Sequence, residues 1–156
     1  MTLRWRWTSW TDMGRDEIYA AIALRERVFC VEQNCAYLDA DGKDARAWHL
    51  LGWAADGTLA AYARVTEPGV RYSEYSIGRV VTSPEARGTG AGRALMAESL
   101  RRIRDQFGEV DLRISAQAYL ERFYGDFGFS TVRGPYLEDQ IPHLEMFRPR
   151  SIFTNS

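Results

Sequence analysis

The spacing of apolar residues predicts an alternation of strands and helices along the chain. Leu3, Trp5 and Trp7 alternate with arginines, which is the period of a strand with one buried face. Between residues 16 and 29 the apolar residues change to helical spacing, and Arg25 falls on the same stripe. A guanidinium on that stripe needs a carboxylate, a carbonyl or a ligand, because burial of an unpaired charge is very costly. Arg25 is therefore a candidate site residue, unless it lies at the rim of the core with its head group in water.

Residues 30–47 are polar and are predicted to form a loop. The Asp56-Gly57 pair between two apolar runs indicates a β-hairpin. Further strands and helices are predicted from the same patterns, with strands at 49–54, 59–66, 75–83, 110–115, 129–133 and 144–147 and helices at 92–107 and 119–127. The resulting class is a mixed α/β fold.

The chain length and charge exclude several kinds of protein. A chain of 156 residues is predicted to form one domain over 1–150, with 151–156 as a C-terminal tail. Its formal charge of −1 does not give the basic surface that nucleic acid or anionic lipid requires, so neither is expected as a partner. No run of 18 apolar residues is present, and Cys30 and Cys35 lack the spacing of a redox or zinc motif. We expect a cytoplasmic protein with reduced thiols.

A metal site is not expected. Asp39, Asp41 and Asp44 lack the full EF-hand pattern, and His49 and His143 are too far apart for an H-E-x-x-H motif.

The densest signal is a glycine-rich turn between a predicted strand and a predicted helix, Arg87-Gly88-Thr89-Gly90-Ala91-Gly92. Glycines let successive main-chain N–H groups approach a phosphate, and the helix that follows adds its positive end. The turn lacks the lysine of an ATP-binding P-loop, and the third glycine of a dinucleotide fingerprint is missing in both registers. It is either a binding site for another phosphate compound or a turn without a ligand.

Two motifs carry a resemblance to a known family. Arg87, Gly90 and Gly92 match the pattern R/Q-x-x-G-x-G/A of the GCN5-related N-acetyltransferases (the GNAT family). Gln117 and Tyr124, followed by Gly128-Phe129, resemble that family's second motif, N-x6-Y followed by G-F, although Gln117 stands where asparagine is usual.

Nearly the whole chain resembles the ElaA-like subgroup of that family. The segments that carry this likeness are Val28 to Gln33, the part of the predicted loop that contains Asp39, Asp41 and Asp44 (the acidic loop), His49-Leu50 and Glu138 to His143. The likeness does not identify the molecule that is acetylated.

The resemblance implies a mixed, mostly antiparallel central sheet of six to seven strands flanked by helices, and transfer of acetyl from acetyl-CoA to an amine. The strand Val80, Val81 and Thr82 would bind the pantetheine arm, and Gln117 would contact the cofactor. The pyrophosphate would bind the turn, at Arg87, Gly88, Thr89, Gly90, Ala91, Gly92 and Arg93. Tyr124 would protonate the departing thiolate, or it is a core tyrosine whose hydroxyl is exposed to solvent.

The acceptor is expected to be a primary amine of a small molecule or peptide. Such an amine must lose a proton before it attacks the thioester directly. The candidate bases are Glu32, Asp41, Asp44, His49 and His143. We take Glu32 and His143, with Tyr124, as the catalytic set. The expected acceptor-binding residues are Arg25, Glu32, Asp41, Asp44 and His49. Each also has an ordinary structural interpretation as a solvated acid, a turn cap or a core histidine.

Two alternatives stay open at the level of the sequence. A second resemblance, to acyl-homoserine-lactone synthases that acylate S-adenosylmethionine, is carried by Arg25, Phe29, Asp39, Asp41, Asp44 and Arg64. Asp39 departs from the glutamate of that signature. The other alternative is a non-catalytic CoA-binding module. A homodimer through the tryptophan-rich first strand or Tyr136-Leu137 is neither favoured nor excluded by the sequence.

Overall fold

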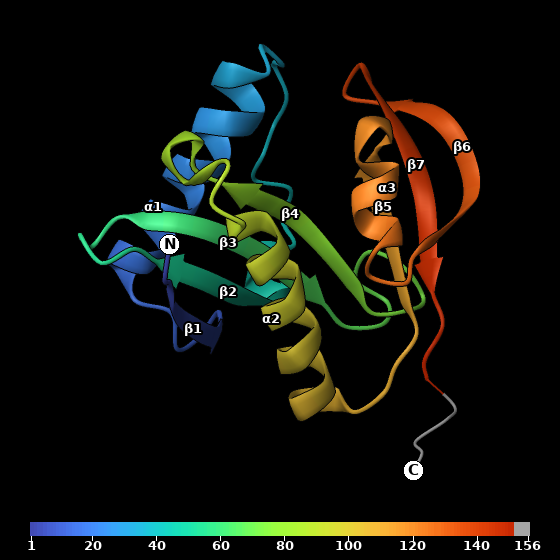
Figure 1. Ribbon diagram of the computed structural model, residues 1–156, viewed down its shortest axis with the longest axis horizontal. Coiled ribbons are helices and arrows are strands. Elements are labelled where there is room, and N and C mark those ends of the chain that lie inside the picture. The colour runs from blue at the N-terminus through green and yellow to red at the C-terminus, as the bar shows by residue number, and fades with distance from the viewer. Residues whose placement is uncertain (152–156) are drawn as a thin grey trace.

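Two antiparallel sheets form the centre of the molecule. The computed structural model describes residues 1–151, and the predicted tail lies outside the described residues beyond Ser151. The first sheet runs in the order β1 (Arg4–Ser9), β2 (Ala47–Trp53), β3 (Leu59–Thr66) and β4 (Ser76–Thr82), and the second in the order β5 (Leu112–Gln117), β7 (Ile141–Arg148) and β6 (Ser130–Glu138) (Figure 1).

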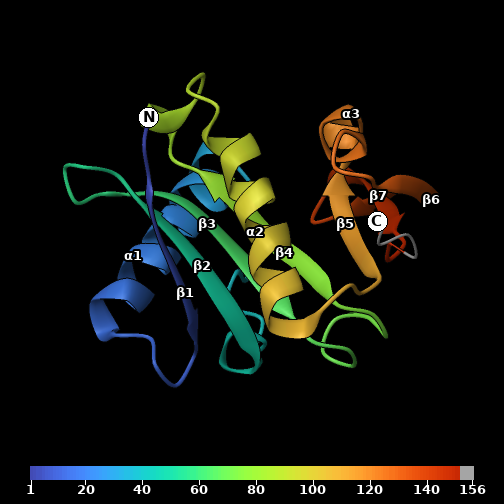
Figure 2. The same cartoon turned by 60° about the horizontal axis from the view of Figure 1, so that its bottom comes forward.

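The two sheets meet at one end and separate at the other. Tyr75, just before β4, forms a parallel bridge with Leu112 at the start of β5, and the amide of Arg113 donates to the carbonyl of Tyr75 at 3.0 Å. Beyond this point β4 and β5 diverge (Figure 2). The mixed, mostly antiparallel architecture predicted from the sequence is therefore confirmed, with its seven strands among residues 1–151 divided between two sheets.

Helices cover both faces of the four-stranded sheet. The helix α2 (Ala91–Phe107) places Leu95 and Met96 in one core with Leu50 of β2. On the other face, α1 (Arg15–Arg25) places Leu24 in a second core with Leu51. Adjacent residues of a strand point to opposite faces, so Leu50 and Leu51 serve different cores.

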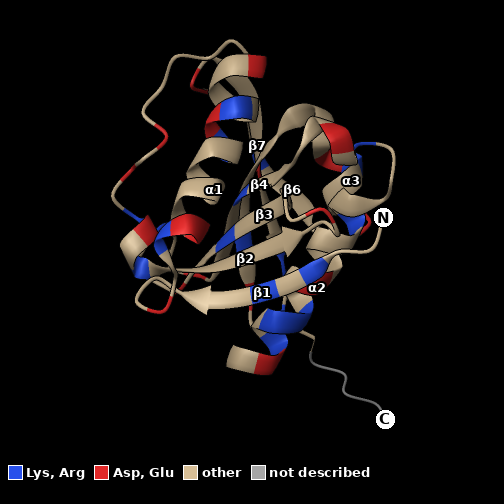
Figure 3. Ribbon diagram, turned by 90° about the vertical axis from the view of Figure 1, so that its left-hand side faces the viewer, with Lys and Arg blue, Asp and Glu red and all other residues tan. Residues whose placement is uncertain are grey.

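Shorter helical segments complete the chain. They are the π-helix η1 (Glu26–Glu32), the 3-10 helices η2 (Asp44–Arg46), η3 (Pro84–Ala86) and η4 (Ala118–Leu120), and the helix α3 (Glu121–Gly125). In Figure 3 charged residues are spread over α1, α2 and the acidic loop without one large field of a single sign. None of the helices within residues 1–151 is long and apolar enough to cross a lipid bilayer.

Predicted boundaries were wrong in two regions of the chain. The loop expected at 30–47 begins only after Glu32, because the first helix continues as η1, and β2 already begins at Ala47. The last two strands are longer than predicted and form a hairpin around Asp139 and Gln140, both with positive φ. Register shifts in β6 near Arg133 break the alternation from which strands are recognised in a sequence.

Candidate active site

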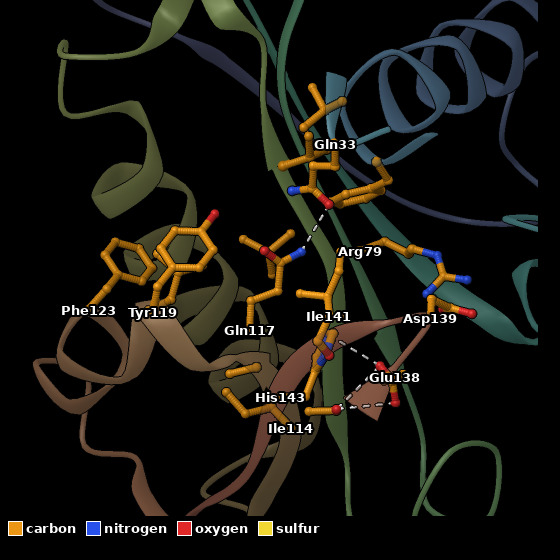
Figure 4. A pocket seen from close by; sticks show the side chains of 18 of the residues that line it. Gln33, Arg79, Ile114, Gln117, Tyr119, Phe123, Glu138, Asp139, Ile141 and His143 are labelled. Carbon is orange, nitrogen blue, oxygen red and sulfur yellow. Dashed lines mark hydrogen bonds and ion pairs between the residues drawn. The ribbon is translucent and has the colours of Figure 1, made fainter. Parts of the chain in front are cut away.

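A cleft of about 590 Å³ opens where β4 and β5 diverge. One wall is formed by Gly78 to Thr82 of β4 together with η1, and the opposite wall by Ile114 to Gln117 of β5 together with α3 and β7 (Figure 4). Such a cavity is large enough for an extended small ligand.

The glycine-rich turn borders one end of the cleft. Gly88 and Gly90 have φ of +76° and +84°, and a Cβ at either position would meet no atom within 4 Å. Glycine is therefore required here by the backbone conformation rather than by lack of space. Because α2 begins at Ala91, directly after the turn, unpaired main-chain N–H groups and the helix dipole both favour an anion here. These residues fit a pyrophosphate group.

Glu32 lies beside the glycine-rich turn. Both Nη atoms of Arg87 donate to its carboxylate, one of them at 2.7 Å, and the hydrogen bond from Arg87 lowers the pKa of Glu32. A second pair, Arg27 with Glu85 at 2.9 Å, also links η1 to the segment before the turn. Glu32, predicted both as a base and as an acceptor contact, is thus an ionised partner of the arginine predicted to hold phosphate.

The strand β4 contains a bulge on the wall of the cleft. Tyr62 of β3 pairs with Val81, but Arg64 pairs with Gly78, so β4 has one more residue than β3 over this stretch. Arg79 has φ of +50°, a conformation that residues other than glycine seldom adopt. In this register neither Arg79 nor Val80 has a partner on β3.

Tyr124 and Gln117 line the cleft from the side of β5. Tyr124 is 6 % exposed and packs edge-on against Phe123 and Phe129. Burial raises the pKa of its phenol, so the hydroxyl keeps its proton at neutral pH. The amide of Gln117 donates to the side-chain oxygen of Gln33 at 3.2 Å, which joins β5 to the residue after η1 (Figure 4).

A cluster of polar side chains from β5, β6 and β7 lies along one side of the cleft. His143 Nε2 is 3.5 Å from a carboxylate oxygen of Glu138, and its Nδ1 is 2.7 Å from the carbonyl of Ile141. Ser115 Oγ lies 2.6 Å from the hydroxyl of Tyr136 and 3.3 Å from a carboxylate oxygen of Glu138. These groups can accept, relay and release a proton.

The other predicted acceptor residues gather elsewhere, in a buried ionic cluster. Arg25 is 1 % exposed and donates to Asp39 at 2.8 Å and to Asp44 at 2.9 Å. Arg64 donates to Asp41 at 2.8 Å and to Asp44 at 3.0 Å.

His49 is packed against the same cluster. Its ring nitrogens lie 2.7 Å from the hydroxyl of Tyr62 and 3.0 Å from the carbonyl of Asp44. Burial lowers the pKa of His49, so it is neutral at pH 7. The lining of the cleft contains none of Arg25, Asp41, Asp44 and His49.

The structure thus places the predicted residues in the cleft, in the buried ionic cluster and in the turn that borders the cleft. Those in the turn outside the cleft lining are Gly88, Thr89, Gly90, Ala91 and Arg93. The cleft brings together the following residues from separate parts of the chain: Glu32, Val80, Val81, Thr82, Arg87, Gly92, Gln117, Tyr124 and His143. Sequence reasoning did not select Arg79, Ser115 or Glu138 as site residues. Glu138 and His143 flank the turn of an unrecognised hairpin, so a strand signal there would have indicated their proximity. Within residues 1–151 no group of three acidic, cysteine or histidine side chains is arranged to hold a metal ion.

Comparisons with known proteins agree with this architecture. The model of the acetyltransferase (GNAT) domain matches residues 20–148. A UPF0039 protein of Synechocystis is 45 % identical over 94 % of this chain and 95 % of its own, and protein ElaA of Escherichia coli is 38 % identical over 94 % and 96 %.

The solved structures agree with the sequence matches. The crystal structure of an acyl-CoA N-acyltransferase from Pseudomonas aeruginosa has a TM-score of 0.89 at 41 % identity, covering 94 % of this chain and 99 % of that one. The crystal structure of Escherichia coli ElaA has a TM-score of 0.87 at 37 % identity, with the same coverage. The chain therefore belongs to the GNAT acetyltransferase family and is similar within it to ElaA.

Proposed function

We propose that this protein transfers the acetyl group of acetyl-CoA to a primary amine of a small molecule or a peptide, by direct attack of the amine on the thioester. The observation that carries this proposal is the cleft between β4 and β5, which is bordered by a turn suited to an anion and lined by a cluster of polar side chains around His143. An extended acyl-CoA, anchored by its phosphates at the turn, would bring its acyl group toward that cluster. Acetyl-CoA would supply an activated acyl group. The residues of the chain would position this group next to the amine and would protonate the departing thiolate.

The residues of the cleft have distinct roles in this proposal. The turn from Arg87 to Arg93 binds the pyrophosphate, while Val80, Val81, Thr82 and Gln117 hold the pantetheine arm. A main-chain amide at the β4 bulge donates to the thioester oxygen. Tyr124, whose pKa is raised by burial, donates its proton to the departing thiolate.

We assign the base to His143. Its ring lies in the cleft, where Nε2 is 3.5 Å from a carboxylate oxygen of Glu138. Glu32 is a less suitable base than His143 because its carboxylate is engaged by Arg87. Arg25, Asp41, Asp44 and His49 support the fold of the cleft in this proposal rather than contact the amine.

Synthesis of an acyl-homoserine lactone is the weaker candidate. Five of the six residues that carried that resemblance are engaged with one another in one cluster: Arg25, Asp39, Asp41, Asp44 and Arg64. The sixth, Phe29, lines the cleft. The role of the five in the fold therefore accounts for their presence without S-adenosylmethionine.

Calorimetric titration followed by an amine screen tests the proposal. We expect micromolar binding of acetyl-CoA and no binding of ATP, NADH or S-adenosylmethionine, and then release of free thiol with at least one primary amine. Binding of S-adenosylmethionine alone would support lactone synthesis. Binding of acetyl-CoA without turnover with any amine would support a CoA-binding module, and no binding would refute the proposal. Both Cys30 and Cys35 are free thiols, so thiol release is measured against a protein-only blank.

A further inference from the structure

Arg79 borders the cleft but makes its polar contacts outside it. Its Nε lies 2.9 Å from the carboxylate of Asp39, and Nη2 donates to the main-chain carbonyl of Asp39 at 3.0 Å. Nη2 also lies 3.4 Å from a carboxylate oxygen of Asp41, and the guanidinium stands over the ring of Tyr37 at 5.6 Å. In Figure 4 the side chain extends away from Gln117. The charge of Arg79 is thus engaged by the acidic loop rather than presented to a ligand.

The backbone at Arg79 is in a conformation that its own residue type does not favour. With φ of +50°, an arginine has its Cβ crowded against the following carbonyl, and a conformation of this kind persists only when surrounding contacts enforce it. Gly78, next to it, would tolerate a positive φ at no cost but does not adopt one. The local sequence therefore does not dictate this bulge.

The acidic loop that engages Arg79 is itself rigidly held. Asp39 is 6 % exposed and accepts hydrogen bonds from Arg25 at 2.8 Å and from the hydroxyl of Tyr37 at 2.7 Å. Asp41 accepts two hydrogen bonds from Arg64, both at 2.8 Å. Three arginines and three aspartates thus form one cluster, which runs from α1 through the loop to the bulge of β4.

We propose that Arg79 is a positioning residue, whose ion pairs with Asp39 and Asp41 hold the β4 bulge in the shape that presents a main-chain amide of Val80 or Val81 to the thioester oxygen. This inference rests on the proposed acetyl transfer. A displaced donor weakens the stabilisation of the negative charge that develops on that oxygen during attack, whereas the phosphates bind at the glycine-rich turn. Arg79 therefore acts mainly on kcat and much less on the affinity for CoA, to which the bulge contributes only through Val80 and Val81 on the pantetheine arm.

Three substitutions separate the conformation from the charge. Arg79→Gly, Arg79→Ala and Arg79→Val all remove the guanidinium, but only glycine adopts a positive φ freely and valine adopts it worst. We expect kcat to fall by about 10-fold in the glycine variant and about 100-fold in the valine variant, with alanine between them. The dissociation constant of CoA should change by much less than kcat in all three, because the phosphate-binding turn is untouched and Thr82 and Gln117 still hold the pantetheine arm.

The matched control is Arg102→Ala, which removes an arginine that is ion-paired to Glu98 at 2.7 Å on α2, outside the cleft. It should leave kcat and CoA binding unchanged. Each variant is assayed at a temperature where its melting curve shows it folded, and if the valine variant does not fold, the comparison of glycine with alanine decides.

The outcomes distinguish the inference from the function on which it rests. If the unaltered protein acetylates an amine but the three variants share one kcat, or CoA binding weakens in parallel with kcat, Arg79 is not a positioning residue. If the unaltered protein binds no acetyl-CoA, the proposed function fails first and the inference fails with it. A graded kcat from glycine to valine with a much smaller change in CoA affinity would support both.

Discussion

Arg25→Met removes the central charge of the buried cluster. Methionine has a long unbranched side chain with nearly the same helix propensity, so the substitution keeps most of the packing and changes mainly the polar contacts. Arg25 is 1 % exposed and donates to the carboxylates of Asp39 and Asp44 and to the main-chain carbonyl of Asp39. Two buried carboxylates lose a partner in the variant.

The structure sets the size of the effect. Removing one partner of a buried ion pair costs about 3–5 kcal/mol, since the remaining charge stays buried. Asp39 still faces Arg79, and Asp44 still accepts from Arg64. We therefore expect the lower end, about 3 kcal/mol less free energy of unfolding at pH 7. For a domain of this size that corresponds to a melting temperature lower by about 6–12 °C.

The loss should depend on pH. Burial alone would raise the pKa of Asp44, but hydrogen bonds and charge from Arg25 and Arg64 lower it below its usual value. Its contribution to stability is therefore complete above about pH 4 and is lost as the pH falls through the lowered pKa, because the unfolded chain takes up the proton first. The difference in stability between the two proteins should consequently shrink below about pH 4.

The difference in free energy of unfolding between the two proteins is measured by urea unfolding, followed by tryptophan fluorescence, from pH 7 to pH 3. Arg46→Met is the matched control, because Arg46 is exposed on η2, and its substitution should change stability by less than about 0.5 kcal/mol. If Arg25→Met were as stable as Arg46→Met at pH 7, the cluster would not support the fold as described, and the anchoring role given to Asp39 would lose its basis.

Three further predictions concern the cleft. Tyr124→Phe should lower kcat by about 100-fold at unchanged KM for acetyl-CoA, because only the proton donor is lost; steady-state kinetics with unaltered turnover would exclude that role. Glu32→Gln should tighten CoA binding by about two- to fivefold in calorimetry, since Arg87 is released from its carboxylate partner, and weaker binding would indicate that Glu32 instead orients Arg87. Gly90→Ala should lower the free energy of unfolding by about 1 kcal/mol and the affinity for CoA by at least about fivefold. The control Gly57→Ala, also at positive φ but in a distant hairpin, should lower only the stability. Equal CoA affinities of the two variants would show that the turn does not bind CoA.

Features that depend on neighbouring residues could be predicted from the sequence. Features that depend on contacts between distant residues could not. The helix with Leu95 and Met96 and the turn with Gly88 and Gly90 follow from residue spacing and glycine chemistry over a few positions. The charge on the apolar stripe of the first helix indicated that Arg25 needs a partner. Its partners lie 14 and 19 residues further along the chain, in a loop whose path no local pattern specifies.

The bulge of β4 and the His143 cluster had no local signal. A positive φ at Arg79, next to a glycine that does not adopt one, is set by ion pairs 38 and 40 residues away in sequence. His143 and Glu138 come together through a hairpin whose strands are interrupted near Gly134 and Pro135, so the alternation that would identify them is broken.

The separation of the strands into two sheets also affects the tendency of the protein to aggregate at high concentration. Because β4 and β5 share only one bridge, each is an edge strand of its own sheet. Edge strands carry unpaired main-chain groups that can recruit a strand from another molecule and start aggregation. Here the edges of β4 and β5 face a cleft inside one molecule. A ligand that lies between these two strands would occupy their unpaired main-chain groups. The substrate would then act as a protectant against self-association, so the unliganded protein is the form most exposed to it.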